Sequence, residues 1–167
     1  MQKTMLAYSK IQLSALVVLR ILLGWYLLYE GLTKLLNPYW TSASYLLESK
    51  WIFSGIFTSI ATSPIALSIV DSINEWGLIA IGLGLILGCF TRIASMAGVI
   101  LLLLYYVSNP PFIGLSYSMP AEGSYLIVNK TLIEMVALFV LYVFPTGSII
   151  GLDVFLCKLR NKEDVRK

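Results

Sequence analysis

Long apolar runs separated by short polar breaks are the feature that most limits how this chain can fold. Four of them are near the length of a transmembrane helix, since about 20 apolar residues cross roughly 30 Å of hydrocarbon. We expect the corresponding helices at about 11–36, 70–90, 92–108 and 125–144. No repeat or linker interrupts them, so the chain is predicted to be a single membrane domain, 1–167, that ends in a tail, 145–167.

Composition supports a membrane protein and argues against a soluble one. Hydrophobic residues make up 58% of the sequence and charged residues 13%, whereas about 25% of the residues of a soluble domain are charged. The net charge of +3 forms no basic stripe, so nucleic acid is not expected as a partner. The predicted fold class is therefore all-α integral membrane, and the expected surroundings are the lipid bilayer.

The distribution of cations predicts the orientation of the spans. One side of the predicted helices holds Lys3, Lys10, Arg92, Lys158, Arg160, Lys162, Arg166 and Lys167. The other side holds only Lys34, Lys50 and Lys130. Because cation-rich segments stay in the cytoplasm, both termini are predicted to be cytoplasmic. Two termini on one side require an even number of spans, which favours a four-transmembrane-helix bundle in the cytoplasmic (inner) membrane.

A further stretch without charges, 51–70, lies between the first two predicted spans. Gly55, Pro64 and many Ser and Thr residues argue against a fifth span there, and so does the even number of crossings. We expect 39–70 to form two short helices that lie on the outer leaflet or dip into it, broken at Thr62-Ser63-Pro64.

One face of the first predicted helix carries ionisable groups. At 100° per residue, Glu30 lies about 80° from Arg20 around the helix axis. Four residues lie within about 40° of Arg20: Gly24, Leu27, Gly31 and Lys34. A charge that faces lipid costs about 3 kcal/mol or more. This face is therefore predicted to point into the bundle.

The predicted topology brings polar residues of the other helices to the same outer end as Lys34. Arg20 and Glu134 would both lie deep in the membrane, where we expect them to approach each other. A neutral network could then join three cations to three anions: Arg20, Lys34 and Lys130 to Glu30, Glu75 and Glu134. Such a network either fixes the helix register or forms a binding site, and intramembrane ionisable groups favour the site.

Residue types that are missing limit the chemistry. The sequence has no histidine, which excludes His metal sites, His-ligated haem and His acid–base catalysis. Its two cysteines, Cys89 and Cys157, lack the spacing of a redox or iron–sulfur motif. We therefore expect no metal and no haem.

Several motifs resemble the DoxX family of membrane proteins. "VVLRILLGWYLLYEGLTKLL" is similar to the first helix of that family. "EWGLIAIGLGLILGCFTRIASMAGVILLL" is similar to its second helix, Thr-Arg turn and third helix. "NPPF", "VNKTLIEM" and "GSIIGLD" resemble the branch related to the DoxD small subunit of thiosulfate:quinone oxidoreductase. The resemblance covers about residues 15–155.

The resemblance implies a membrane subunit of a quinone-linked oxidoreductase that acts with a partner membrane or peripheral redox subunit. The family's polar positions fall on Arg20, Glu30, Lys34, Glu75, Arg92, Lys130 and Glu134. We expect quinone, or a similar small amphiphile, in a pocket near the outer leaflet beneath a lid at 109–124. The expected roles are proton transfer by Glu75 and Glu134, and an ion pair of structural importance for Arg20. Ligand contact is expected from Glu30, Lys34, Lys130, Asn109 and Trp76.

Two other functions are compatible with these residues. The chain could be a non-catalytic scaffold that assembles a partner protein, or a second copy of itself, through 39–70 and the small-residue ridge Ala80, Gly84 and Gly88. It could also form a pathway for protons or a small solute through the polar core. Quinone that co-purifies in mild detergent would favour the oxidoreductase subunit over both.

Single cysteines introduced at Lys3, Ser44, Ala121 and Asn161 test the topology. Labelling with a membrane-impermeant thiol reagent should report inside, outside, outside and inside, because the cation distribution places both termini in the cytoplasm. Any other order would contradict four spans and the convergence of polar helix ends.

Overall fold

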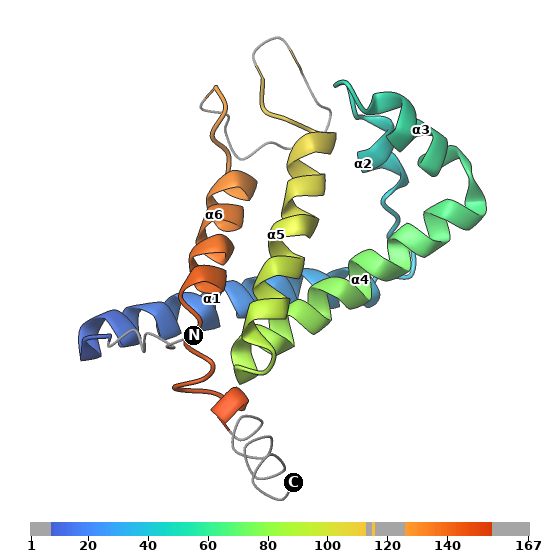
Figure 1. Ribbon diagram of the computed structural model, residues 1–167. Helices are drawn as coiled ribbons and strands as arrows, with labels where there is room; N and C mark the ends of the chain where they lie inside the picture. Colours follow the sequence, from blue (N-terminus) through green and yellow to red (C-terminus); the bar gives the residue numbers. More distant parts are fainter. Residues whose placement is uncertain (1–7, 113–114, 116–125, 155–167) are drawn as a thin grey trace, which may run out of the picture.

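The computed structural model describes residues 8–112, 115 and 126–154. Its regular elements are six helices (Figure 1). They are α1 (Lys10–Leu35), α2 (Ala43–Leu47), α3 (Ser54–Thr62), α4 (Pro64–Leu87), α5 (Thr91–Ser108) and α6 (Lys130–Val143). The predicted all-α class is confirmed for this part of the chain.

Three of these helices, α1, α4 and α5, are long and apolar enough to cross a membrane. α6 has 14 residues and is therefore about 21 Å long, which is less than the thickness of the hydrocarbon core. Helix length in the described ranges thus supports three candidate spans, and the fourth predicted crossing stays a prediction.

Local signals explain where the helix boundaries differ from those predicted. Pro64 occupies the first turn of α4, where its missing N–H is not needed, so this helix begins well before residue 70. The Asn129 side chain accepts a hydrogen bond from Leu132 N and caps α6, which therefore begins after residue 125. The break at Ser63 is confirmed, but both short helices, α2 and α3, lie before it. The predicted second short segment partly differs, since 64–70 belong to α4.

The long helices form two antiparallel pairs, α1 with α4 and α5 with α6, and the two pairs cross steeply in Figure 1. Apolar side chains of all four helices meet between the pairs. The core consists of Leu27, Leu78, Ile81, Leu85, Ala94, Leu102, Leu138 and Leu141. On α1 the buried residues are Arg20, Gly24, Leu27 and Gly31, which confirms the face predicted to point inward.

Glycines set the short distance between α1 and α4. A Cβ atom on Gly82 would lie 2.5 Å from Leu28 N and 2.7 Å from Gly24 O. A Cβ atom on Gly31 would lie 2.8 Å from Ile79 Cγ1. No residue larger than glycine fits at these positions without a shift of the backbone.

The small-residue ridge predicted on α4 is not the surface that meets α1. Ala80 is exposed. A Cβ atom on Gly84 would instead meet Ala94 of α5, at 3.1 Å. Gly82 has the central role because it shares a face with the buried Leu78 and Leu85.

Gly82→Ala should destabilise the protein, because the new methyl group would push α1 away from α4. We expect a loss of about 1–3 kcal/mol in the free energy of unfolding, measured by denaturant titration in detergent micelles. Gly77→Ala is the matched control: it lies on the same helix with no atom within 4 Å of a Cβ, and should stabilise by up to about 1 kcal/mol. Equal effects of the two changes would contradict the close contact.

Candidate functional site

Lys34 is the centre of a polar cluster between α1, α4 and α5. Its Nζ donates hydrogen bonds to Asn74 Oδ1 at 3.0 Å and to Tyr105 Oη at 3.4 Å. The same Nζ lies 3.3 Å from Glu30 Oε1, one helical turn away. The Lys34 side chain is only 13% exposed, whereas that of Glu30 is 42% exposed. We call Glu30, Lys34, Asn74 and Tyr105 the Lys34 cluster.

Aromatic rings complete the surroundings of the Lys34 ammonium. Nζ lies 5.0 Å from the centroid of the Trp40 ring and 5.3 Å from that of Tyr105. Cations at these distances are attracted by the negative face of an aromatic ring. The Lys34 ammonium is therefore surrounded by the Glu30 carboxylate, the Asn74 amide, the Tyr105 hydroxyl group and the rings of Trp40 and Tyr105.

Residues 40–49, which we call the α2 segment, lie against this cluster. Tyr45 Oη donates to Tyr105 O at 2.9 Å, Asn109 Nδ2 donates to Tyr45 O at 3.1 Å, and Ser49 Oγ donates to Ser108 O at 2.8 Å. These bonds hold the α2 segment on α5. The lid predicted at 109–124 lies mostly outside the described residues.

The other end of the α2 segment is held by α4. Asp71 accepts hydrogen bonds from Thr41 Oγ1 and from Ser42 N, both at 2.9 Å, and from Ser42 Oγ. A carboxylate with several donors is a strong anchor. The α2 segment is thus fixed at both ends, with the Lys34 cluster beside it.

The α6 side of the site joins this cluster through Tyr26. Lys130 Nζ lies 4.6 Å from the centroid of the Tyr26 ring. Tyr26 is close enough to interact electrostatically with Glu134 and with Glu30. Glu75 interacts in the same way with Lys34. These contacts bring α6 to Tyr26 of α1 and relate Glu75 to Lys34, while the predicted network of Glu30, Lys34, Glu75, Lys130 and Glu134 stays a prediction.

One predicted ligand contact, Trp76, lies apart from the Lys34 cluster. Trp76 is 60% exposed and lies on the outer surface of α4. Asn74, two residues earlier and therefore about 200° away around the axis, is buried and contacts Lys34.

Two neutral polar residues of the site, Asn74 and Tyr105, are not among the residues predicted from the sequence. A signal was present for Asn74, which shares one face of α4 with the buried Leu78, Ile81 and Leu85 at spacings of four, three and four. An amide on such an apolar stripe needs a partner. Tyr105 gave no comparable signal, because tyrosines near a helix end are typical of a membrane interface.

Arg20 lies in a different cluster, about 21 Å from Lys34 along α1. The guanidinium Nη1 donates to Thr146 Oγ1 at 3.1 Å and to Ile150 O at 2.8 Å, and the residue is only 3% exposed. The carboxylate that attracts it is Asp153. The predicted contact with Glu134 is therefore wrong, because Arg20 is held by the segment that follows α6.

That segment, 145–154, is fixed on the turn between α4 and α5. The Asp153 carboxylate accepts hydrogen bonds from Phe90 N at 2.7 Å, Thr91 N at 3.2 Å and Thr91 Oγ1 at 2.8 Å. It thereby caps α5 and stabilises a turn in which Phe90 has a φ of 50°. The tail predicted from residue 145 onward thus begins as an ordered part of the fold.

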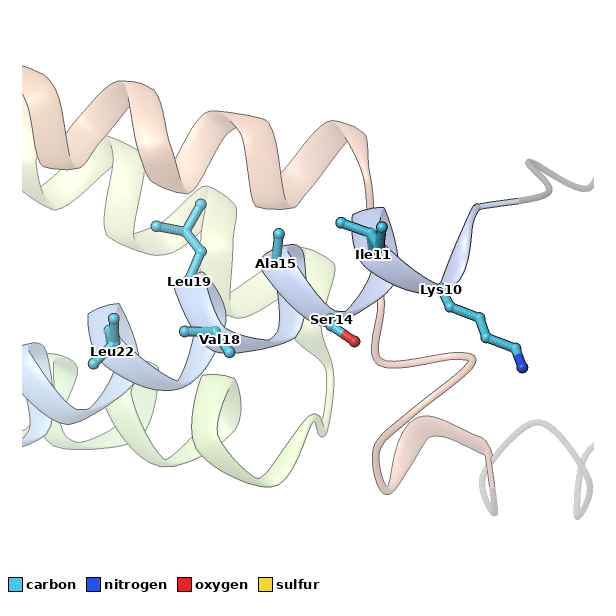
Figure 2. A pocket seen from close by; sticks show the side chains of 7 residues that line it. All are labelled: Lys10, Ile11, Ser14, Ala15, Val18, Leu19 and Leu22. Carbon is cyan, nitrogen blue, oxygen red and sulfur yellow. The ribbon is translucent and has the colours of Figure 1, made fainter.

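An open hollow lies along the N-terminal half of α1 (Figure 2). It is lined by Lys10, Ile11, Ser14, Ala15, Val18, Leu19 and Leu22. This apolar surface lies toward the opposite end of α1 from Lys34, so it is not the predicted quinone pocket. In the described ranges, no three His, Cys, Asp or Glu side chains are grouped so that they could hold a metal ion.

Lys34→Met should destabilise the protein by about 1–3 kcal/mol, because it leaves the buried Asn74 Oδ1 without its donor. The double variant Lys34→Met/Asn74→Leu should recover part of this loss, which unfolding titrations of the two single variants and the double variant would measure as a coupling energy. Lys10→Met, at the exposed start of the same helix, is the control. Strictly additive losses would contradict the Lys34–Asn74 bond.

Comparison with known proteins identifies the family. The model of the DoxX family matches residues 15–109, which is more than half of the chain. This range contains the whole Lys34 cluster, Arg20 and the turn between α4 and α5, whereas α6 with Lys130 and Glu134 lies outside it. No curated protein and no solved structure matches the chain. The chain therefore belongs to the DoxX family and is a multi-pass membrane protein.

Proposed function

We propose that this protein is an integral membrane subunit of a quinone-linked oxidoreductase and binds quinone, or a similar small amphiphile, at the Lys34 cluster. The observation that carries the proposal is the nearly buried Lys34 ammonium beside a half-exposed Glu30. A structural ion pair needs only these two groups. Lys34 also reaches Asn74 and Tyr105, and its 3.4 Å contact with Tyr105 Oη is long for a hydrogen bond. The N–H of Lys34 that points to Tyr105 Oη is therefore the one suited to a ligand oxygen.

The chemistry of the surrounding groups fits a quinone. The two carbonyl oxygens of a quinone accept hydrogen bonds, which the Lys34 and Lys130 ammonium groups donate. Reduction by two electrons adds two protons, and Glu75 and Glu134 are the carboxyl groups that supply them. The Tyr26 ring, which contacts Lys130, provides a flat apolar surface for the head group.

The proposal includes a topology of four spans, with α6 as the fourth. α6 packs antiparallel to α5, which is a candidate span, and 145–154 then return to the start of α5. Both termini would lie in the cytoplasm, and the Lys34 cluster would lie near the outer leaflet of the cytoplasmic membrane. The electron donor would bind through a partner membrane or peripheral subunit, as the motifs similar to the DoxD branch suggest.

Ligand analysis and variants test the proposal together. Quinone should be found by mass analysis after purification in mild detergent. Lys130→Met and Glu75→Gln should each weaken the binding of a short-chain quinone analogue about tenfold, since a hydrogen bond to a charged group contributes about 1.5–3 kcal/mol. Lys10→Met, far from the cluster, should bind normally. The proposal is wrong if no quinone co-purifies and both variants, correctly folded, bind the analogue as the parent does.

A further inference from the structure

Two buried polar atoms at the end of α5 have no hydrogen-bond partner: Ser108 Oγ and Asn109 Oδ1. Ser108 is 1% exposed. The orientation of the Asn109 amide is fixed, because its Nδ2 donates to the carbonyl oxygen of Tyr45. Oδ1 is therefore the atom that is left over, and it can only accept a hydrogen bond.

Such atoms are rare in folded proteins, because burial removes their bonds to water without a replacement. These two belong to neighbouring residues and are connected to the Lys34 cluster by direct contacts. Asn109 bonds to Tyr45, the Tyr45 ring lies edge-on to Tyr105 with 5.9 Å between centroids, and Tyr105 Oη accepts from Lys34. The unused bonding capacity thus adjoins the site proposed for the ligand.

We propose, on the basis of the function proposed above, that Asn109 makes this site selective for the reduced form of its ligand. An oxidised quinone presents carbonyl oxygens, which only accept hydrogen bonds and repel another acceptor. The reduced quinol presents hydroxyl groups, and one of these donates to Asn109 Oδ1. Asn109 is therefore a specificity residue, which distinguishes the two redox forms by hydrogen-bond direction.

Ser108 has a different role, because a hydroxyl group both donates and accepts. Ser108 Oγ donates to a quinone carbonyl or accepts from a quinol hydroxyl, and so contributes to the binding of either form. Lys34 likewise donates to either form. Selectivity at this end of the site thus rests on the one group that only accepts, Asn109 Oδ1.

The ligand reaches these atoms when the α2 segment moves. Asn109 Nδ2 and Ser49 Oγ make the bonds that hold this segment on α5, at Tyr45 O and Ser108 O. Both unpartnered atoms are enclosed while these bonds are intact. Binding of the head group therefore breaks the Ser49–Ser108 bond and displaces that end of the α2 segment, while the Asn109–Tyr45 bond stays intact and keeps Oδ1 as the atom that faces the ligand.

Equilibrium binding of one short-chain quinone analogue, in its oxidised form and in its reduced form under anaerobic conditions, tests the inference. The purified parent should bind the reduced form about tenfold more tightly. A tenfold preference raises the midpoint potential of the bound two-electron couple by about 30 mV, which redox titration measures independently.

Three variants separate the role of Asn109 from a general loss of structure. Asn109→Leu should bring the ratio of the two dissociation constants close to one, whereas Asn109→Asp, which keeps an acceptor, should retain the preference. Ser108→Ala should weaken the binding of both redox forms and leave the ratio of their dissociation constants unchanged. Asn37→Leu, which replaces an exposed amide just after α1, is the matched control and should behave as the parent.

The outcomes distinguish the inference from the function on which it rests. Equal binding of the two forms by the parent, or an unchanged ratio in Asn109→Leu, overturns the inference and assigns the two atoms to bound water. If Asn109→Leu does not fold, the ratio of the two dissociation constants of the parent decides whether the inference holds. Failure of the parent to bind either form overturns the proposed function itself.

Discussion

The close approach of α1 to α4 is the contact on which the rest of the structure depends. Gly24 and Gly31 on one helix meet Gly82 and its neighbours on the other, at distances that exclude a side chain. Because the backbones are so near, side chains on the same face of α1 reach across α4. Lys34 bonds to Asn74 at one end, and Arg20 lies against Gly88 at the other. A wider spacing would separate Lys34 from Asn74 and leave the buried ammonium without that partner.

The two cations of α1 are stabilised in different ways, which distinguishes the structural role of Arg20 from the place of Lys34 at the candidate site. Arg20 is held through Nη1 of its guanidinium on the segment after α6, within a compact arrangement that also caps α5 through Asp153. Lys34, a compact point charge, is surrounded by groups from several helices and by an open carboxylate. The first arrangement closes one end of the helices. The second lies beside a carboxylate whose side chain is 42% exposed.

Neutral polar groups determine the hydrogen bonding at the end of α1 that carries Lys34. Asn74 and Tyr105 place the ammonium without cancelling its charge, while Asp71 and Asn109 fix the α2 segment beside it. In a medium of low dielectric constant, an unpaired donor or acceptor is costly. In the described residues, Ser108 Oγ and Asn109 Oδ1 are unpaired near the Lys34 cluster, as are Arg20 Nε and Ser95 Oγ elsewhere in the fold. Carboxylates and lysines alone would have given a salt bridge. The amide and hydroxyl groups instead give hydrogen bonds of defined direction at this site.

The sequence by itself determined the helices, the inward face of α1 and the family. These features follow from local chemistry: apolar runs of span length, the 100° step between residues, and motifs in a fixed order. It also predicted that Glu30, Lys34, Glu75, Lys130 and Glu134 gather at one end, because helix ends on one side of a bundle converge. Only the tertiary structure decided the partners. Arg20 meets Thr146 and not Glu134, and Asn74 rather than Trp76 faces Lys34. These contacts depend on the crossing of the helix pairs and on the rotation of each helix about its axis. Neither is encoded in the sequence pattern of a single helix.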